Sequence, residues 1–210
     1  MHTTSNLCSH NSLVKKNVAI FIALLLLLCL TFVQSSNAQT AYKIGGKQAL
    51  MTLNGTSTLH DWTMAAHSLS GKAQFDVSSD NKLNGLESLT LTLLVANLKG
   101  ESGGLNDNAY KALKADRNKN IAFLLTSAQL TSTGVRKYKI VALGNLTIAG
   151  VTKPITLNVT AQVDTDGTIA CSGTVPLKMS DYGVERPSFM LGAMKASDAL
   201  TLEFALTFIK

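Results

Sequence analysis

Few side chains in this sequence have the types and spacing that chemistry requires. His60 and Asp61 are adjacent, His67 follows seven residues after His60, and Cys171 is the only cysteine beyond residue 38. A histidine beside an aspartate can act as a general acid or base, but no G-x-S-x-G nucleophile motif and no phosphate-binding glycine loop accompanies the pair. Two histidines without a companion cysteine do not form a metal-ligand pattern. The sequence therefore favours a structural or pocket-polar role for His60, and it predicts no enzyme, no metal and no cofactor.

The first 38 residues predict a secretory signal peptide. Lys15 and Lys16 precede an apolar run over 18–33, and the small residues Ser36 and Ala38 follow it. Basic residues, an apolar core and small residues at these two positions are typical of a cleaved signal. A membrane anchor is the alternative, but the run is shorter than the roughly 20 residues that span a bilayer. We expect cleavage after Ala38, a periplasmic or secreted protein, and one domain over 39–210.

The composition of that domain excludes some partners. Removing Lys15 and Lys16 from the 19 basic residues leaves 17 against 13 acidic ones, spread along the chain. This mild, unclustered positive charge does not indicate a nucleic-acid partner. Cys171 alone cannot form an internal disulfide, so packing must hold the exported fold together.

Apolar and polar residues alternate along most of the domain, most clearly over 138–163. Alternate positions from Tyr138 to Ile148, and again from Ile155 to Val163, carry apolar or small side chains. A period of two buries one face of a β-strand and exposes the other. Gly150 suits a tight turn, and Pro154 suits the first residue of the returning strand. The pattern predicts a long antiparallel hairpin.

Further strands and one helix follow from the same kind of pattern. Alternation predicts strands within 49–53, 58–64, 69–77, 89–95, 121–125, 169–175 and 200–208. After Gly103-Gly104, Asn106 or Asp107 can cap a short helix that ends near Asp116. The segment 182–199 shows no regular alternation.

This set of elements predicts an all-β, antiparallel fold. About eight long amphipathic strands can close into a β-barrel without edges, leaving room for side chains and one small ligand. One short α-helix would accompany the barrel. A two-sheet sandwich is the alternative architecture.

The segment 144–155 resembles the G-x-L-T-I-x-G-x-T-K-P-[IV] hairpin of the YceI-like proteins. Segments 57–71, with His60, 112–123, 179–183 and 200–208 are similar to that family in the same order, so the resemblance covers nearly all of 41–210. It implies an exported, lipocalin-like extended barrel that holds a long polyisoprenoid or similar amphiphilic lipid for transport, storage or sequestration. An extracytoplasmic structural or interaction module, with a barrel filled by its own side chains, is the alternative.

The apolar faces of the hairpin and the last strand predict the residues that line the interior. A long apolar chain can bind there with few polar contacts, because each buried methylene contributes roughly 0.8 kcal/mol. Specificity then comes from the length of the tunnel and a few polar groups at its mouth. The segment 188–194, which is apolar and rich in methionine, fits either a core plug or a flexible lip. The predicted lining residues are Leu146, Ile148, Ile155, Leu157, Phe204 and Phe208, with Trp62, Phe123, Phe189 and Met190 as further candidates and His60 as the polar one.

Overall fold

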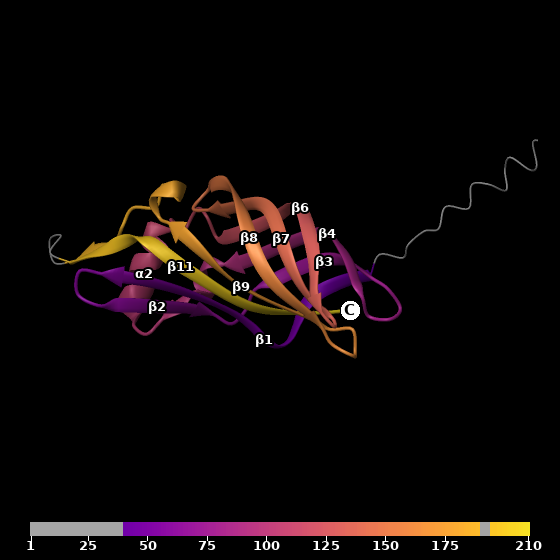
Figure 1. Ribbon diagram of the computed structural model, residues 1–210. Helices are drawn as coiled ribbons and strands as arrows, with labels where there is room; N and C mark the ends of the chain where they lie inside the picture. The colour runs from indigo at the N-terminus through magenta and orange to yellow at the C-terminus, as the bar shows by residue number, and fades with distance from the viewer. Residues whose placement is uncertain (1–39, 190–193) are drawn as a thin grey trace, which may run out of the picture. The chain divides into compact units, whose positions relative to one another are not determined.

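The structure is a computed structural model that describes residues 40–189 and 194–210 (Figure 1). Within these ranges the chain forms eleven β-strands, one α-helix and two short 3-10 helices. The strands are β1 (Thr40–Ser57), β2 (Asp61–Ala66), β3 (Ser70–Val77), β4 (Leu83–Leu94), β5 (Lys99–Gly100), β6 (Asn120–Gly134), β7 (Lys137–Ile148), β8 (Val151–Val163), β9 (Ile169–Lys178), β10 (Ser188–Phe189) and β11 (Met194–Ile209). The helices are η1 (Val95–Asn97), α2 (Gly103–Ala112) and η2 (Ser180–Tyr182).

Eight of the strands close into a ring. They follow the order β11-β9-β8-β7-β6-β4-β3-β1, and β1 pairs back onto β11. Every pairing is antiparallel, and the closing pair places Ile44 opposite Phe208 and Met51 opposite Phe204. The predicted antiparallel barrel with one short α-helix is confirmed, and the sandwich is wrong because the ring has no break between two sheets. Short strands β2, β5 and β10 extend the sheet beyond the ring.

The β7–β8 hairpin has the predicted position and inward face. Its register runs from Lys137 opposite Gln162 to Ile148 opposite Val151. The connecting residues Ala149 and Gly150 have φ values of 49° and 82°, which is the positive-φ pair that a type I′ turn requires.

The prediction that Pro154 begins the returning strand is wrong, because β8 begins at Val151 and Pro154 lies opposite Asn145. Strand β9 pairs with β8 only from Val159 to Val163. The part of β8 that contains Pro154 is therefore paired on one side only, where a residue without an N–H is tolerated.

Helix α2 begins earlier than the sequence pattern predicts. Ser102 is the N-cap, and its side chain accepts a hydrogen bond from the Leu105 N–H at 3.2 Å. The expected caps Asn106 and Asp107 lie inside the helix instead. Asn106 Oδ1 accepts a hydrogen bond from the Gly100 N–H at 2.7 Å, so it ties the helix to β5. The start of the helix was missed because Gly103 and Gly104 are typical of a loop and not of a first helical turn.

The region 182–199 also contains more regular structure than predicted. Strand β11 begins at Met194, six residues before the expected Leu200. Backbone pairing extends it, with Ala196 opposite Ser57 and Ala199 opposite Lys178. Among the described side chains from 195 to 199 only Ala196 is buried, so this part of the strand carries no apolar alternation to detect.

The inward faces of the strands form the hydrophobic core. Along β7 the buried side chains are Tyr138, Ile140, Ala142 and Leu146, as the alternation predicts. No polar or charged residue is buried in the part of the chain that the structure describes. No helix within the described ranges is both long enough and apolar enough to span a membrane.

Replacing Gly144 by alanine tests how closely β6 and β7 approach. A Cβ at Gly144 would overlap the Phe123 ring and lie 2.5 Å from the Leu124 carbonyl oxygen. Because backbone cannot yield as a flexible side chain does, we expect Gly144→Ala to lower the free energy of unfolding by about 1–3 kcal/mol. Denaturant unfolding measures the change, and Gly134→Ala is the control, since no atom lies within 4 Å of a Cβ there. Equal losses in both variants would contradict the predicted contact.

Candidate ligand-binding cavity

A large cavity, which we call the outer cavity, lies between α2 and the barrel. Its volume is about 380 Å³. Helix α2 contributes Leu105, Ala109 and Ala112, which share one face at helical spacing. Leu53 on β1 and Met64 on β2 face the same space. Figure 1 shows α2 at the end of the barrel away from the C-terminus. The outer cavity is therefore a mostly apolar space at one end of the fold.

Polar side chains also line part of the outer cavity. They are Ser57, His60, Glu101, Ser102, Asn108, Lys178, Tyr182 and Lys195. Lys178, Lys195, Glu101 and His60 are exposed. We call these four residues the polar rim. They present two ammonium groups, one carboxylate and one imidazole, so they can bind a polar head group of either sign.

The backbone turn between β1 and β2 fixes the position of His60. Ser57 Oγ donates to the His60 carbonyl at 2.8 Å and accepts from the His60 N–H at 3.2 Å. The His60 ring Nδ1 lies 2.8 Å from the backbone carbonyl of Asp61. The ring thus contacts the peptide group and not the Asp61 carboxylate, so the adjacent pair does not form the hydrogen bond that acid–base catalysis by a His–Asp couple uses.

Trp62 stands at the same end on β2. Its Nε1 donates to the Thr56 carbonyl at 3.2 Å, which satisfies its polar atom. A Cβ at Gly55, the cross-strand partner of Trp62, would overlap the indole ring. Glycine at position 55 therefore lets the indole lie across β1, with the remainder of the ring facing the outer cavity.

A second space, the inner cavity, lies deeper in the barrel. Its volume is about 80 Å³. Every residue that lines it is apolar or, at Cys171, a thiol. Phe75 and Phe208, both buried, lie on its walls, and their rings pack edge to face with centroids 5.4 Å apart. Tyr42 packs against Phe75 in the same manner at 5.3 Å. We call these three rings the aromatic cluster. Its one polar atom is the buried Tyr42 hydroxyl, which has no hydrogen-bond partner among the described residues.

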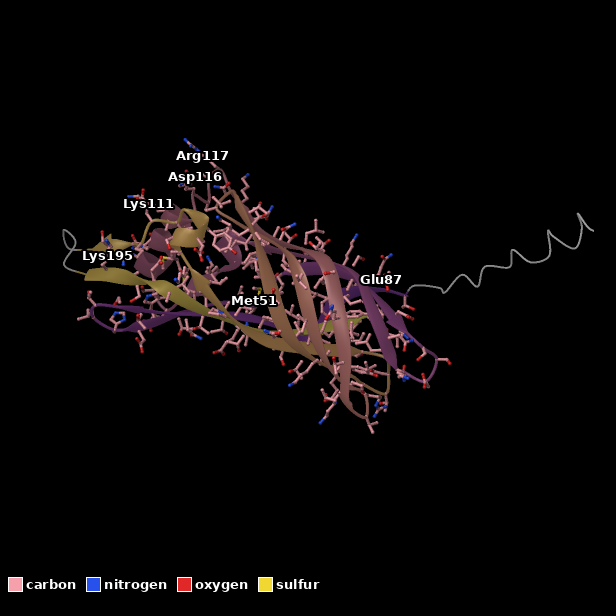
Figure 2. All side chains as sticks on the ribbon, turned by 45° about the horizontal axis from the view of Figure 1, so that its top comes forward. Met51, Glu87, Lys111, Asp116, Arg117 and Lys195 are labelled. Carbon is pink, nitrogen blue, oxygen red and sulfur yellow. The ribbon has the colours of Figure 1, made fainter. Side chains whose placement is uncertain are left out.

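The two cavities adjoin. The residues that line both are Met51, Leu93, Ile121, Leu146 and Leu202, and we call them the junction residues. They come from β1, β4, β6, β7 and β11, so they surround the interior at one level. Figure 2 shows Met51 midway along the barrel, between Lys195 and Glu87. A single apolar chain that passes the junction residues would occupy both cavities.

The structure places nine of the predicted lining residues around these cavities. Leu146 lines both of them. The outer cavity contains Ile148, Trp62 and His60, and the inner cavity contains Ile155, Leu157, Phe123, Phe204 and Phe208. The side chain of Phe189 and the whole of Met190 lie outside the described residues. Contact of any of these residues with a ligand stays a prediction.

The sequence did not single out most of the outer cavity. Leu105, Ala109 and Ala112 on α2 were missed as lining residues, although the helical spacing of Ala109 and Ala112 was visible. Met51 and Leu53 occupy alternate positions, and this pattern predicted a strand. It did not show that the two side chains face the outer cavity. Glu101, Lys178 and Lys195 carried no signal, because single charged residues are usually part of a solvated surface.

The chemistry of Cys171 gives a test of the buried inner cavity. Burial raises the pKa of the Cys171 thiol from 9.0 to about 12. Only the thiolate reacts, so at pH 8 we expect the folded protein to react with an aromatic disulfide reagent about 1000-fold more slowly than the unfolded chain. Absorbance of the released thiolate measures both rates. Cys171→Ser gives the background from Cys8 and Cys29. Equal rates with and without denaturant would show that the inner cavity is open to solvent.

Metal binding has no support in the described ranges, where no three His, Cys, Asp or Glu residues gather closely enough to hold an ion. What the arrangement offers is an apolar interior with polar groups at one end. This is the geometry of a site for an amphiphile.

Solved structures have the same fold. Burkholderia cenocepacia BcnA matches with a TM-score of 0.59 and 20% identity, over 76% of this chain and 95% of that one. A polyisoprenoid-binding domain from Saccharophagus degradans, implicated in plant cell wall breakdown, matches with a TM-score of 0.62 and 13% identity, over 80% of this chain and 97% of that one. The YceI protein of Campylobacter jejuni matches with a TM-score of 0.51 and 21% identity, over 70% and 84%.

Comparison with curated proteins gives no match. At these identities the solved structures establish the fold alone. The family follows from the sequence, because the model of the YceI-like domain matches residues 33–208, most of the chain. With the closed eight-stranded ring and the resemblance of segment 144–155, this match places the protein in the YceI-like family.

Proposed function

We propose that this protein is an exported carrier that holds a long-chain polyisoprenoid or a similar amphiphilic lipid inside its barrel. The observation that carries the proposal is the pair of adjoining cavities, which are apolar along their depth and bordered by charged groups only at the polar rim. A ligand that fits must have an apolar chain and a polar end. The polyisoprenoid-binding domain with the same fold supports this ligand class.

The energetics suit a ligand of this kind. Each methylene that leaves water for the barrel contributes roughly 0.8 kcal/mol, and the interior requires no polar partner from the chain. The two cavities also count against a module whose barrel is filled by its own side chains, since close packing leaves few voids larger than a water molecule. Binding rather than catalysis is supported by the His60 ring, which contacts a backbone carbonyl instead of a carboxylate.

Export is part of the proposal. Lys15, Lys16 and the apolar run 18–33 favour cleavage after Ala38. N-terminal sequencing of the protein recovered from its native host should read Gln39 or a close neighbour. A mature chain that still starts at Met1 would contradict export by this route.

Mass spectrometry tests the ligand. Protein purified from the native host without detergent is extracted with organic solvent, and we expect one dominant amphiphilic lipid in near-equal amount to the protein. Leu146→Trp places an indole among the junction residues, so it should reduce the bound lipid strongly. Asn145→Trp adds the same bulk at an exposed position of the same strand and should retain the lipid. An extract without lipid, or equal lipid in both variants, would contradict the proposal.

A further inference from the structure

The wall of the barrel has a seam between β8 and β9. The two strands pair only over 159–163 and 169–173. Figure 1 shows them diverging from there toward the end of the barrel where α2 lies. Beyond the paired part, β8 pairs with β7 alone and β9 pairs with β11 alone. Side chains, and not backbone hydrogen bonds, must therefore close this part of the wall.

The segment 180–186, which we call the flap, lies beside both strands of the seam. It contains η2, which packs against β8 and β9. Tyr182 and Val184 are 4% and 8% exposed, and both line the outer cavity. A Cβ at Gly183 would lie 3.9 Å from Cγ2 of Val151 on β8, which is ordinary van der Waals contact. The flap thus forms the wall of the outer cavity where the two strands do not pair.

Hydrogen bonds attach the flap to β11 and not to β8. Backbone bonds fix the residues at its two ends, because the Met179 N–H donates to the Asp198 carbonyl and the Ala196 N–H donates to the Pro187 carbonyl, each at 3.0 Å. Within the flap, the Ser180 N–H and Oγ donate to the Asp198 carboxylate at 2.8 and 2.6 Å. Across the described residues, no hydrogen bond joins the flap to β8. Lifting the flap therefore breaks the two bonds of Ser180 and a few apolar contacts, but no strand pairing.

We propose that the flap is a gate, and that the lipid chain enters and leaves the barrel sideways between β8 and β9. This inference rests on the proposed function and adds the route of the ligand to it. A long chain that entered by its end would have to thread the whole interior, whereas an open seam admits the chain side-on. Segments with few buried contacts open far more often than paired strands separate, and such openings set the rate of ligand exchange at many sites.

Asp198 is a positioning residue for this gate, because its carboxylate holds Ser180 and its side chain lines neither cavity. Asp198→Ala removes both bonds, so the flap should lift more often in the empty and in the loaded protein. We expect association and dissociation both to become about tenfold faster while Kd stays within about twofold. Asp198→Asn keeps an acceptor for the Ser180 N–H and a donor for its Oγ, so it should restore both rates.

Stopped-flow fluorescence of the delipidated full-length protein measures these rates. Parinaric acid is the probe, since its emission rises when its chain leaves water. Mixing with the protein gives the association rate, and transfer from the loaded protein to phosphatidylcholine vesicles gives the dissociation rate. A role of Asp198 in stability alone would lower the unfolding temperature without accelerating both rates at constant Kd.

A disulfide across the seam tests the gate in the opposite direction. Val151 and Gly183 lie close enough for cysteines at these two positions to pair. The double variant Val151→Cys, Gly183→Cys is made in a chain whose Cys8 and Cys29 are replaced by serine. We expect the oxidised form to take up and release parinaric acid at least about tenfold more slowly than the reduced form. The reduced form is the control, because any strain from a side chain at a φ of 62° is present in both.

Three results would overturn the inference. Equal rates in the oxidised and reduced double variant, or unchanged rates in Asp198→Ala, would mean that the chain enters elsewhere. A change in Kd that comes from only one of the two rates would mean that Asp198 acts on the bound state and not on a gate. If neither parinaric acid nor a competing polyprenol binds to the unchanged protein, the proposed function fails, and the gate with it. Thermal unfolding confirms that each variant is folded, and the disulfide decides the matter if Asp198→Ala is not.

Discussion

Replacing Leu157 by aspartate is expected to lower the free energy of unfolding by about 3–5 kcal/mol at pH 8. The side chain is 8% exposed and faces an inner cavity lined by apolar side chains and one thiol, that of Cys171, with no cation among them. A carboxylate there loses its hydration without gaining a partner. We expect the same variant to lose its lipid, since a charged group in the path of an apolar chain repels it.

The loss in Leu157→Asp should depend on pH in a defined direction. Burial without a partner raises the pKa of the new carboxyl group in the folded state above its unfolded value of about 3.9. Below about pH 4 the carboxyl is protonated in both states, so the penalty is smallest there. As pH rises, the unfolded chain ionises first, and the free energy of unfolding falls by about 1.4 kcal/mol per pH unit until the folded group also ionises.

Urea unfolding at about pH 4 and about pH 8 measures this difference, with the unchanged protein measured at both values. Thr156→Asp is the control, because its exposed carboxylate should change the free energy of unfolding by no more than about 0.5 kcal/mol at either pH. A Leu157→Asp variant as stable as Thr156→Asp, or one whose deficit is the same at both pH values, would mean that Leu157 does not face an apolar interior.

Phe75→Ala is the second large effect, with an expected loss of about 3–5 kcal/mol. Phe75 is 1% exposed on β3 and touches Tyr42 from β1 and Phe208 from β11, with ring planes 89° and 74° apart. Edge-to-face pairs contribute about 0.5–1.5 kcal/mol beyond the burial of their area. Because the three strands meet where β1 closes the ring, the variant loses contacts on both sides of that closure.

Thermal and denaturant unfolding measure the loss in Phe75→Ala. Lys72→Ala, at an exposed position of the same strand, is the control, and we expect it to remain within about 0.5 kcal/mol of the unchanged protein. If Phe75→Ala unfolds at the same denaturant concentration as Lys72→Ala, the aromatic cluster does not hold the barrel closed.

Sequence patterns predicted the walls of the fold well, for a physical reason. Strands such as 138–148 and 151–163 bury one face, so apolar residues at every second position show which side chains point inward. Inward positions such as Leu157 and Phe208 could therefore be named in advance. The hairpin register was not predicted, because the sequence placed the start of the returning strand at Pro154, whereas β8 begins at Val151 and the turn consists of Ala149 and Gly150.

The ends of elements and the polar rim were not predictable in this way. Ser102 caps α2 through one side-chain hydrogen bond. Asn106 is an equally suitable N-cap by residue type, so the sequence did not show which of the two begins the helix. Strand β11 extends back to Met194 through backbone pairing. Backbone pairing does not require apolar residues at alternate positions, so no sequence pattern indicated this extension. Lys178, Lys195 and Glu101 are far apart in the sequence and line the same cavity because the chain folds into a barrel. The sequence around a single surface charge does not indicate such neighbours.

The most direct test of the central claim is a crystal structure of the protein purified from its native host without detergent. We expect continuous electron density for one chain that starts at the polar rim, passes the junction residues Met51, Leu146 and Leu202, and ends against Phe75 and Phe208. An interior in which side chains close both cavities, in protein whose extract holds no lipid, would contradict the carrier and favour a barrel filled by its own residues.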